Sequence, residues 1–158
     1  MGLFDKLKKP KKQFEDFFTE LQADMVDICL EYAENYTDMI YIYCSCEPDI
    51  MAADVFYRIN GECLRKNKIN DAPGEHPTYT TTAENQRTVI KVLMEDLDKI
   101  KALCEEHNRP MPTQMKLYFN GKTRAFDANY IYDLVCSNDS EKLPTDVFSE
   151  WFIEESKK

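Results

Sequence analysis

Apolar residues recur at helical spacing in three segments of the chain. In residues 13–35 they follow one another mostly at steps of three and four, at Phe14, Phe17, Phe18, Leu21, Met25, Ile28 and Tyr32. This periodicity predicts an amphipathic helix with one stripe turned toward a core. A second helix is predicted over 83–106, with Thr81 or Thr82 as its N-cap, and a third over 145–156.

Between these segments the pattern changes to the two-residue alternation of β-strands. Residues 39–46 are rich in β-branched and aromatic types, which favour strands. Further strands are predicted at 52–59 and 62–65, around Asn60-Gly61, and at 114–119 and 122–132, around Asn120-Gly121. Asn-Gly between two apolar runs is the strongest short signal for a two-residue type I′ hairpin. We therefore expect two hairpins, each closed by such a turn.

The predicted elements follow the order α-β-β-β-α-β-β-α. Hairpin-linked strands without β-α-β alternation indicate an antiparallel sheet. We expect a single α+β domain over residues 13–158, in which the helices pack on one face of an antiparallel sheet of about five strands.

Charge is distributed unevenly along the chain. Residues 1–12 contain five lysines and one aspartate, a net charge of +4, so the remaining residues carry −13 of the total of −9. We expect residues 1–12 to form a flexible, solvated basic leader. The alternative is weak attachment to a membrane surface through Leu3, Phe4, Leu7 and the lysines. The leader lacks the apolar core of a signal peptide, because charged residues interrupt its apolar ones.

Composition excludes several classes of protein. A sequence pI near 4.8 argues against direct nucleic-acid binding, since phosphate neutralisation needs clustered Lys and Arg. No apolar stretch approaches the roughly 20 residues that span a bilayer, so integral membrane association is not expected. With six cysteines and no signal peptide, the expected compartment is the reducing cytoplasm, where thiols remain free.

Helix 13–35 contains seven acidic residues and no Lys or Arg. Six of them, beginning at Asp16, recur at helical spacing on another side than the apolar stripe. The last five are the candidate surface, and we call them the acidic row: Glu20, Asp24, Asp27, Glu31 and Glu34. Like charges at i,i+4 destabilise a helix by roughly a few tenths of a kcal/mol per pair. An uncompensated row of this kind suits a basic partner. The alternative is an ordinary solvated helix face.

Residue patterns that carry catalysis are missing from the sequence. It contains no Gly-x-Ser-x-Gly, no His-Glu-x-x-His and no Gly-rich phosphate loop. Two groups are candidate metal ligands, Cys44 and Cys46 with Cys63, and Asp127 with Asp133. Their spacing lacks the Cys-x2-Cys knuckle and the paired histidines of common metal sites. We expect no enzyme activity, no metal and no other cofactor.

The C-terminal third of the chain resembles a known family. Its segments are Gln114-Met115-Lys116-Leu117-Tyr118-Phe119, Asn120-Gly121, Ala125-Phe126-Asp127 and Tyr130-Ile131-Tyr132-Asp133, then a polar linker and a helix with Phe148-Ser149-Glu150-Trp151. An acidic helix, a Tyr-rich strand, a hairpin and a long helix precede them. This order resembles the YezG-like family of bacterial immunity proteins, the antitoxin family that includes EsaG, over about residues 14–156.

The resemblance implies an intracellular protein, without catalysis, that binds and neutralises a toxin delivered between bacteria, often a nuclease. A nuclease domain presents positive charge to its substrate, so an acidic inhibitor can occlude that surface. We expect the acidic row to bind the toxin, with Tyr130, Tyr132 and Trp151 as candidate aromatic anchors. Alternatively, these aromatics are core residues. The alternative function is an adaptor or regulatory domain held weakly at membranes by the basic leader.

Overall fold

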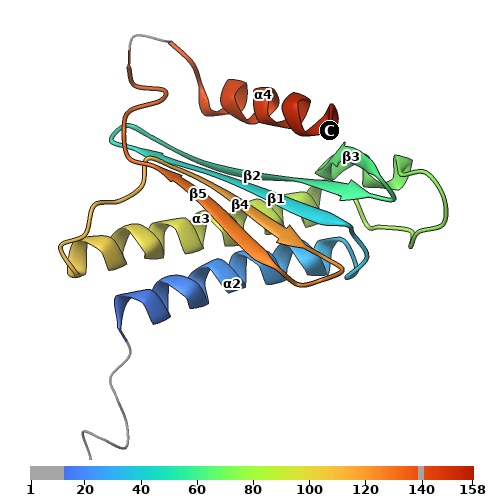
Figure 1. The fold of residues 1–158 in the computed structure, drawn as a ribbon, viewed down its shortest axis with the longest axis horizontal. Helices are drawn as coiled ribbons and strands as arrows, with labels where there is room; N and C mark the ends of the chain where they lie inside the picture. Colours follow the sequence, from blue (N-terminus) through green and yellow to red (C-terminus); the bar gives the residue numbers. More distant parts are fainter. Residues whose placement is uncertain (1–12, 139–140) are drawn as a thin grey trace, which may run out of the picture.

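The computed structural model describes residues 13–138 and 141–158, so the expectations about the basic leader lie outside the described residues (Figure 1). The elements are α2 (Phe14–Tyr32), β1 (Met39–Glu47), β2 (Ile50–Ile59), β3 (Glu62–Arg65), the 3-10 helix η1 (Lys66–Asp71), α3 (Ala83–Glu106), β4 (Gln114–Asn120), β5 (Phe126–Ile131) and α4 (Pro144–Ser156). The predicted order of helices and strands, and the α+β class, are confirmed.

The sheet has five antiparallel strands in the order β3-β2-β1-β4-β5. β1 is the central strand and pairs with β2 along its whole length, from Met39 opposite Arg58 to Glu47 opposite Ile50. On its other side β1 pairs with β4, which follows α3 in the chain. The edges of the sheet are therefore β3 and β5.

Alternation along β1 turns two sets of side chains toward opposite layers. Ile40, Ile42 and Cys44 belong to the core beneath α2 and α3, whereas Tyr41 and Tyr43 belong to a second, aromatic cluster with α4. Helices α2 and α3 thus cover one face of the sheet, as predicted, but α4 covers the other (Figure 1). This corrects the expectation that all helices share a face.

The physical reason for the position of α4 lies in the aromatic rings of the central strands. Tyr41 and Phe56 stack with ring centroids 4.4 Å apart on the face away from α2 and α3. Without cover, these large rings would meet water. Trp151 and Phe148 of α4 pack against these two rings. The aromatic residues that alternate along the strands therefore also form the surface on which the last helix packs.

The two hairpins close differently. At the β2–β3 turn, Asn60 (φ 50°) and Gly61 (φ 88°) both have positive φ, as a type I′ turn requires. The predicted two-residue turn at Asn120-Gly121 is wrong, because residues 121–125 form a longer connection in which Arg124 takes the positive φ. The Asn120 side chain causes this: its Oδ1 accepts the backbone N–H groups of residues 122 and 123 at 2.9 and 3.0 Å.

Polar side chains at both ends of the sheet bind segments that are distant in the sequence. Arg58 on β2 donates to the Glu155 carbonyl at the end of α4 (2.7 Å), to the Gly61 carbonyl (3.1 Å) and to the Tyr41 hydroxyl (3.2 Å). At the opposite end of β1, the buried Glu47 carboxylate accepts the backbone N–H groups of residues 135–137 at 2.7 to 3.1 Å. Burial raises the pKa of Glu47, but these donors outweigh it and hold the pKa below its usual value.

Candidate protein-binding surface

The acidic row lies on the side of α2 that faces away from the sheet. Met25, Val26 and Cys29 are buried on the opposite side of the helix. Of the predicted apolar stripe, Met25 and Tyr32 are buried, whereas Phe17 is exposed. All five residues of the acidic row are exposed: Glu20, Asp24, Asp27, Glu31 and Glu34. Glu34 follows the end of α2, in a left-handed backbone conformation (φ 50°). The predicted helix over 13–35 is thus shorter than expected, yet its last acid remains at the surface.

Most of the acidic row carries uncompensated negative charge. Among the described residues, no Lys or Arg lies within ion-pair distance of Asp27, Glu31 or Glu34. Glu15, at the other end of the helix and outside the row, is paired with Arg109 at 2.9 Å. The unpaired carboxylates of α2 and of the residues that follow it therefore lie toward the C-terminal end of the helix, where the helix macrodipole is also negative.

Asp24 departs from the rest of the acidic row because it leans toward α3. Its carboxyl neighbours that of Asp96, a residue of α3 that is only 2% exposed. Burial and then the neighbouring Asp24 carboxyl raise the pKa of Asp96 to about 7. One role of Asp24 is therefore internal, at the contact between the two helices.

A shallow notch of about 180 Å³ lies between α2 and the first turns of α3. Its walls carry two carboxylates of the acidic row with polar side chains of α3 and the preceding loop, and the lining residues are Ile28, Glu31, Tyr32, Glu34, Thr80, Asn85, Thr88 and Val89. Two unpaired carboxylates beside amide and hydroxyl groups can receive the ammonium or guanidinium end of a basic side chain.

The three candidate aromatic anchors have different surroundings. Trp151 is 2% exposed and packs edge-on against Tyr41, Phe56 and other rings of the aromatic cluster, so it belongs to the core. Tyr130 and Tyr132 are exposed at and just beyond the end of β5. The Tyr130 hydroxyl accepts a hydrogen bond from Gln22 Nε2 at 2.8 Å, which ties β5 to α2. Only the two tyrosines remain available to a partner.

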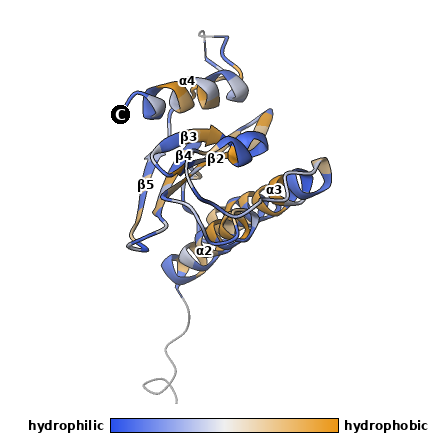
Figure 2. Ribbon diagram, turned by 90° about the vertical axis from the view of Figure 1, so that its right-hand side faces the viewer, coloured by the Kyte–Doolittle hydropathy of each residue, from blue (hydrophilic) through white to orange (hydrophobic). Residues whose placement is uncertain are grey.

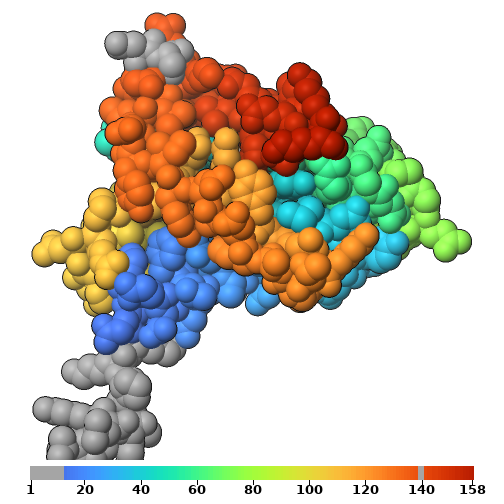
Figure 3. Space-filling model, viewed as in Figure 1, coloured from blue at the N-terminus to red at the C-terminus, as the bar shows by residue number. Residues whose placement is uncertain are grey.

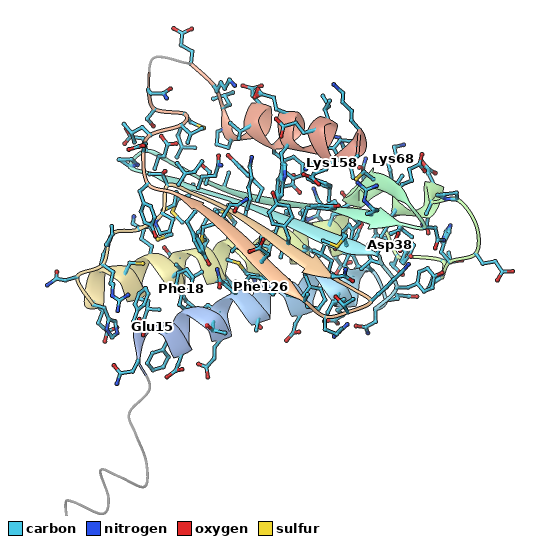
Figure 4. All side chains as sticks on the ribbon, viewed as in Figure 1. Glu15, Phe18, Asp38, Lys68, Phe126 and Lys158 are labelled. Atoms are coloured by element: carbon cyan, nitrogen blue, oxygen red, sulfur yellow. The ribbon has the colours of Figure 1, made fainter. Side chains whose placement is uncertain are left out.

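An apolar groove runs between α2 and the β5 edge, and the sequence patterns did not indicate it. Its volume is about 270 Å³, and it is lined by Thr19, Gln22, Ala23, Val26, Asp27, Leu30, Phe119, Arg124 and Phe126. A second hollow, with Phe18 and Tyr130 in its wall, lies farther along the same seam. Figure 4 shows Phe18 and Phe126 at this seam. In the sequence, the groove is indicated only by the alternation of Phe126, Ala128 and Tyr130. This alternation predicts a groove only when β5 is known to be an edge strand.

The structure does not bring Cys63 together with Cys44 and Cys46, which the sequence offered as candidate metal ligands. Cys44 and Cys46 belong to the core under α2 and α3, whereas Cys63 belongs to the aromatic cluster on the other face. Asp127 Oδ1 accepts the backbone N–H of Ala128 at 2.9 Å. Within residues 13–138 and 141–158, His, Cys, Asp and Glu side chains form no group of three or more that could hold a metal ion. In the same residues, no helix has the length and apolar character needed to cross a bilayer.

Comparison of the chain with models of known protein families yields no match, and comparison with curated proteins yields none. The likeness to YezG-like immunity proteins therefore stays a prediction from the sequence.

Proposed function

We propose that this chain is an immunity protein that binds a basic toxin domain, such as a nuclease, and neutralises it by occluding its positively charged surface. The observation that carries the proposal is the exposed, uncompensated part of the acidic row, Asp27, Glu31 and Glu34. Two carboxylates on the solvent-facing side of α2 and a third just after its end, none of them with a described cation, form a negative surface complementary to a nucleic-acid-binding site.

The notch between α2 and α3 adds a specific docking position to this surface. A lysine or arginine of the toxin enters it and meets the carboxylates of Glu31 and Glu34. A charge-assisted contact of this kind fixes the orientation of the complex, while the rest of the row accelerates association. The expected complex is therefore fast to form and sensitive to salt.

The first step of the test is capture of the tagged chain from the cells that produce it, with identification of co-eluting proteins by mass spectrometry. The proposal expects one basic domain in a 1:1 ratio. That domain is then purified, and its affinity for the chain is measured by calorimetry at low and high salt. Added chain should abolish the activity of the domain.

The second step compares two triple charge reversals that change the net charge equally. One replaces Asp27, Glu31 and Glu34 by Lys, and the control replaces Asp49, Glu75 and Glu106, three exposed acids on other surfaces, by Lys. Surface charges contribute up to about 1 kcal/mol each, so the first variant should bind roughly 10- to 100-fold more weakly. An equal loss of affinity in both variants, or no loss in either, would reject the acidic row as the binding surface.

A further inference from the structure

The β5 edge of the sheet is open. β5 is hydrogen-bonded to β4 alone, and all of its residues except Ala128 are exposed. Figure 3 shows this segment on the surface between α2 and α4, and Figure 2 places it at one margin of the sheet. The other edge strand, β3, has only four residues and continues directly into η1. Proteins usually shorten, charge or cover exposed edges, and β5 has a single charged residue, Asp127.

The register with β4 decides which backbone groups of β5 face outward. The Ala125 carbonyl accepts the Asn120 N–H at 2.9 Å, so Ala125 turns its backbone groups toward β4. Because direction alternates along an antiparallel strand, Asp127, Asn129 and Ile131 also bond inward. The backbone groups of Phe126, Ala128 and Tyr130 therefore point away from the sheet, where a further strand can reach them.

We propose that β5 pairs antiparallel with β5 of a second copy of this chain, in a register centred on Ala128, so that two five-stranded sheets join into one. In this register Ala128 lies opposite its own copy, Phe126 opposite Tyr130, and Asp127 opposite Asn129. The contact is isologous, as a twofold dimer requires. The proposal is independent of the function proposed above.

Self-complementarity in this register is the argument for a second copy as the occupant. Each of the two Phe126–Tyr130 positions brings together aromatic rings that are 43% and 38% exposed in the monomer. Aromatic cross-strand pairs are among the stabilising ones, and like charges directly opposite each other are destabilising. Centring the pair on Ala128 keeps the two copies of Asp127 apart, whereas centring it one residue earlier would place them face to face.

Pairing also satisfies the backbone at the centre of the edge. In the monomer the Ala128 N–H is bonded to the side chain of its own neighbour, Asp127. In the dimer this N–H bonds to the Ala128 carbonyl of the other copy, and the carboxylate turns to Asn129 of that copy. The small Ala128 side chains let the two strands approach at the twofold axis.

The test is sedimentation velocity of the full chain over a wide concentration range, with two substitutions at one exposed position. Asn129→Asp places a carboxylate opposite Asp127 twice per dimer and should raise the dissociation constant of the dimer roughly 3- to 30-fold, less so at high salt. Asn129→Lys creates two opposite-charge pairs and should lower it. The matched control is Asn67→Asp, the same change at an exposed site of η1.

Circular dichroism of each variant confirms that the fold is retained. A chain that stays monomeric at every concentration overturns the proposal. So does a dimer that Asn129→Asp and Asn67→Asp affect equally, because its contact then lies elsewhere. A dimer weakened by Asn129→Lys also overturns the proposal. That result would mean that the two introduced lysines repel each other, so that position 129 lies opposite its own copy and not opposite Asp127.

Discussion

At the scale of single residues, the buried Asp96 makes the contact between α2 and α3 sensitive to pH. The residue is 2% exposed, and its Oδ2 has no hydrogen-bond partner in the described structure. The folded chain raises the pKa of Asp96 from 3.8 to about 7, through burial and the nearby Asp24. Between these two values the folded state holds a proton that the unfolded state releases. The free energy of unfolding therefore falls as pH rises from about 4 to 7.

Asp96→Asn should remove this dependence, because the amide stays neutral at every pH. Since one pKa unit corresponds to about 1.4 kcal/mol, we expect the variant to be more stable than the parent by roughly 1–3 kcal/mol at pH 8 and nearly equal at pH 4. Urea unfolding at several pH values measures the difference. Asp98→Asn, at an exposed site of the same helix, is the control and should leave the pH profile unchanged. A destabilised Asp96→Asn variant at pH 8 would contradict the argument.

At the scale of elements, Gly121 sets how closely the β4–β5 connection approaches the start of β1. Its N–H donates to the Asp38 carbonyl at 2.8 Å, and a Cβ at this position would lie 2.0 Å from the Thr37 carbonyl oxygen. Gly121→Ala forces the two backbones apart and should lower the free energy of unfolding by roughly 1–3 kcal/mol.

Gly61→Asn is the comparison for Gly121→Ala, since a Cβ at Gly61 meets nothing within 4 Å and asparagine tolerates positive φ. It should change the free energy of unfolding by about 1 kcal/mol or less. Chemical denaturation of both variants checks the pair. A larger loss in Gly61→Asn than in Gly121→Ala would show that backbone conformation, and not close approach, governs these turns.

Docking of α4 on the sheet is also testable, through the single tryptophan of the chain. Arg58→Ala removes three hydrogen bonds, one of them to the last turn of α4. It should lower the free energy of unfolding by roughly 2–3 kcal/mol and shift the emission of Trp151 to longer wavelength at lower urea concentration than in the parent. Arg87→Ala, at an exposed site on α3, is the control. Coincident curves for the two variants would mean that Arg58 does not hold α4.

Local patterns predicted the elements well where periodicity is uninterrupted. The bounds of α3 (Ala83–Glu106) and β3 (Glu62–Arg65) match the predicted segments. α2 ends earlier than predicted because Glu34 and Asn35 take positive φ. The returning strand begins only at Phe126, since the Asn120 side chain builds a longer turn.

Local sequence patterns could not predict how distant segments pack, and this packing determines which residues of the candidate site are exposed. Helical spacing correctly predicted that the acidic row would be exposed. The strand order that makes β5 an edge, and the choice of face by α4, depend on contacts between distant segments. For this reason Trp151, which the sequence offered as a surface anchor, lies in the core.

At the scale of the whole molecule, the fold protects every cysteine. All six thiols are free and buried, on both faces of the sheet. Burial raises the pKa of each thiol, that of Cys44 to about 12, so the reactive thiolate is scarce. We expect Ellman's reagent to modify the native chain only at the rate at which it opens, and all six thiols to react in denaturant. Rapid reaction of even one thiol in the native protein would contradict this.

The central position of β1 has a consequence for the synthesis of the chain. β1 receives β2 within a hairpin, but its other neighbour, β4, is made only after α3. At about 5–20 residues per second, several seconds pass on the ribosome before β4 emerges. During that interval the unpaired side of an apolar strand is open to other chains. Nascent or truncated chains that end before β4 are thus the forms of this protein that most need a chaperone.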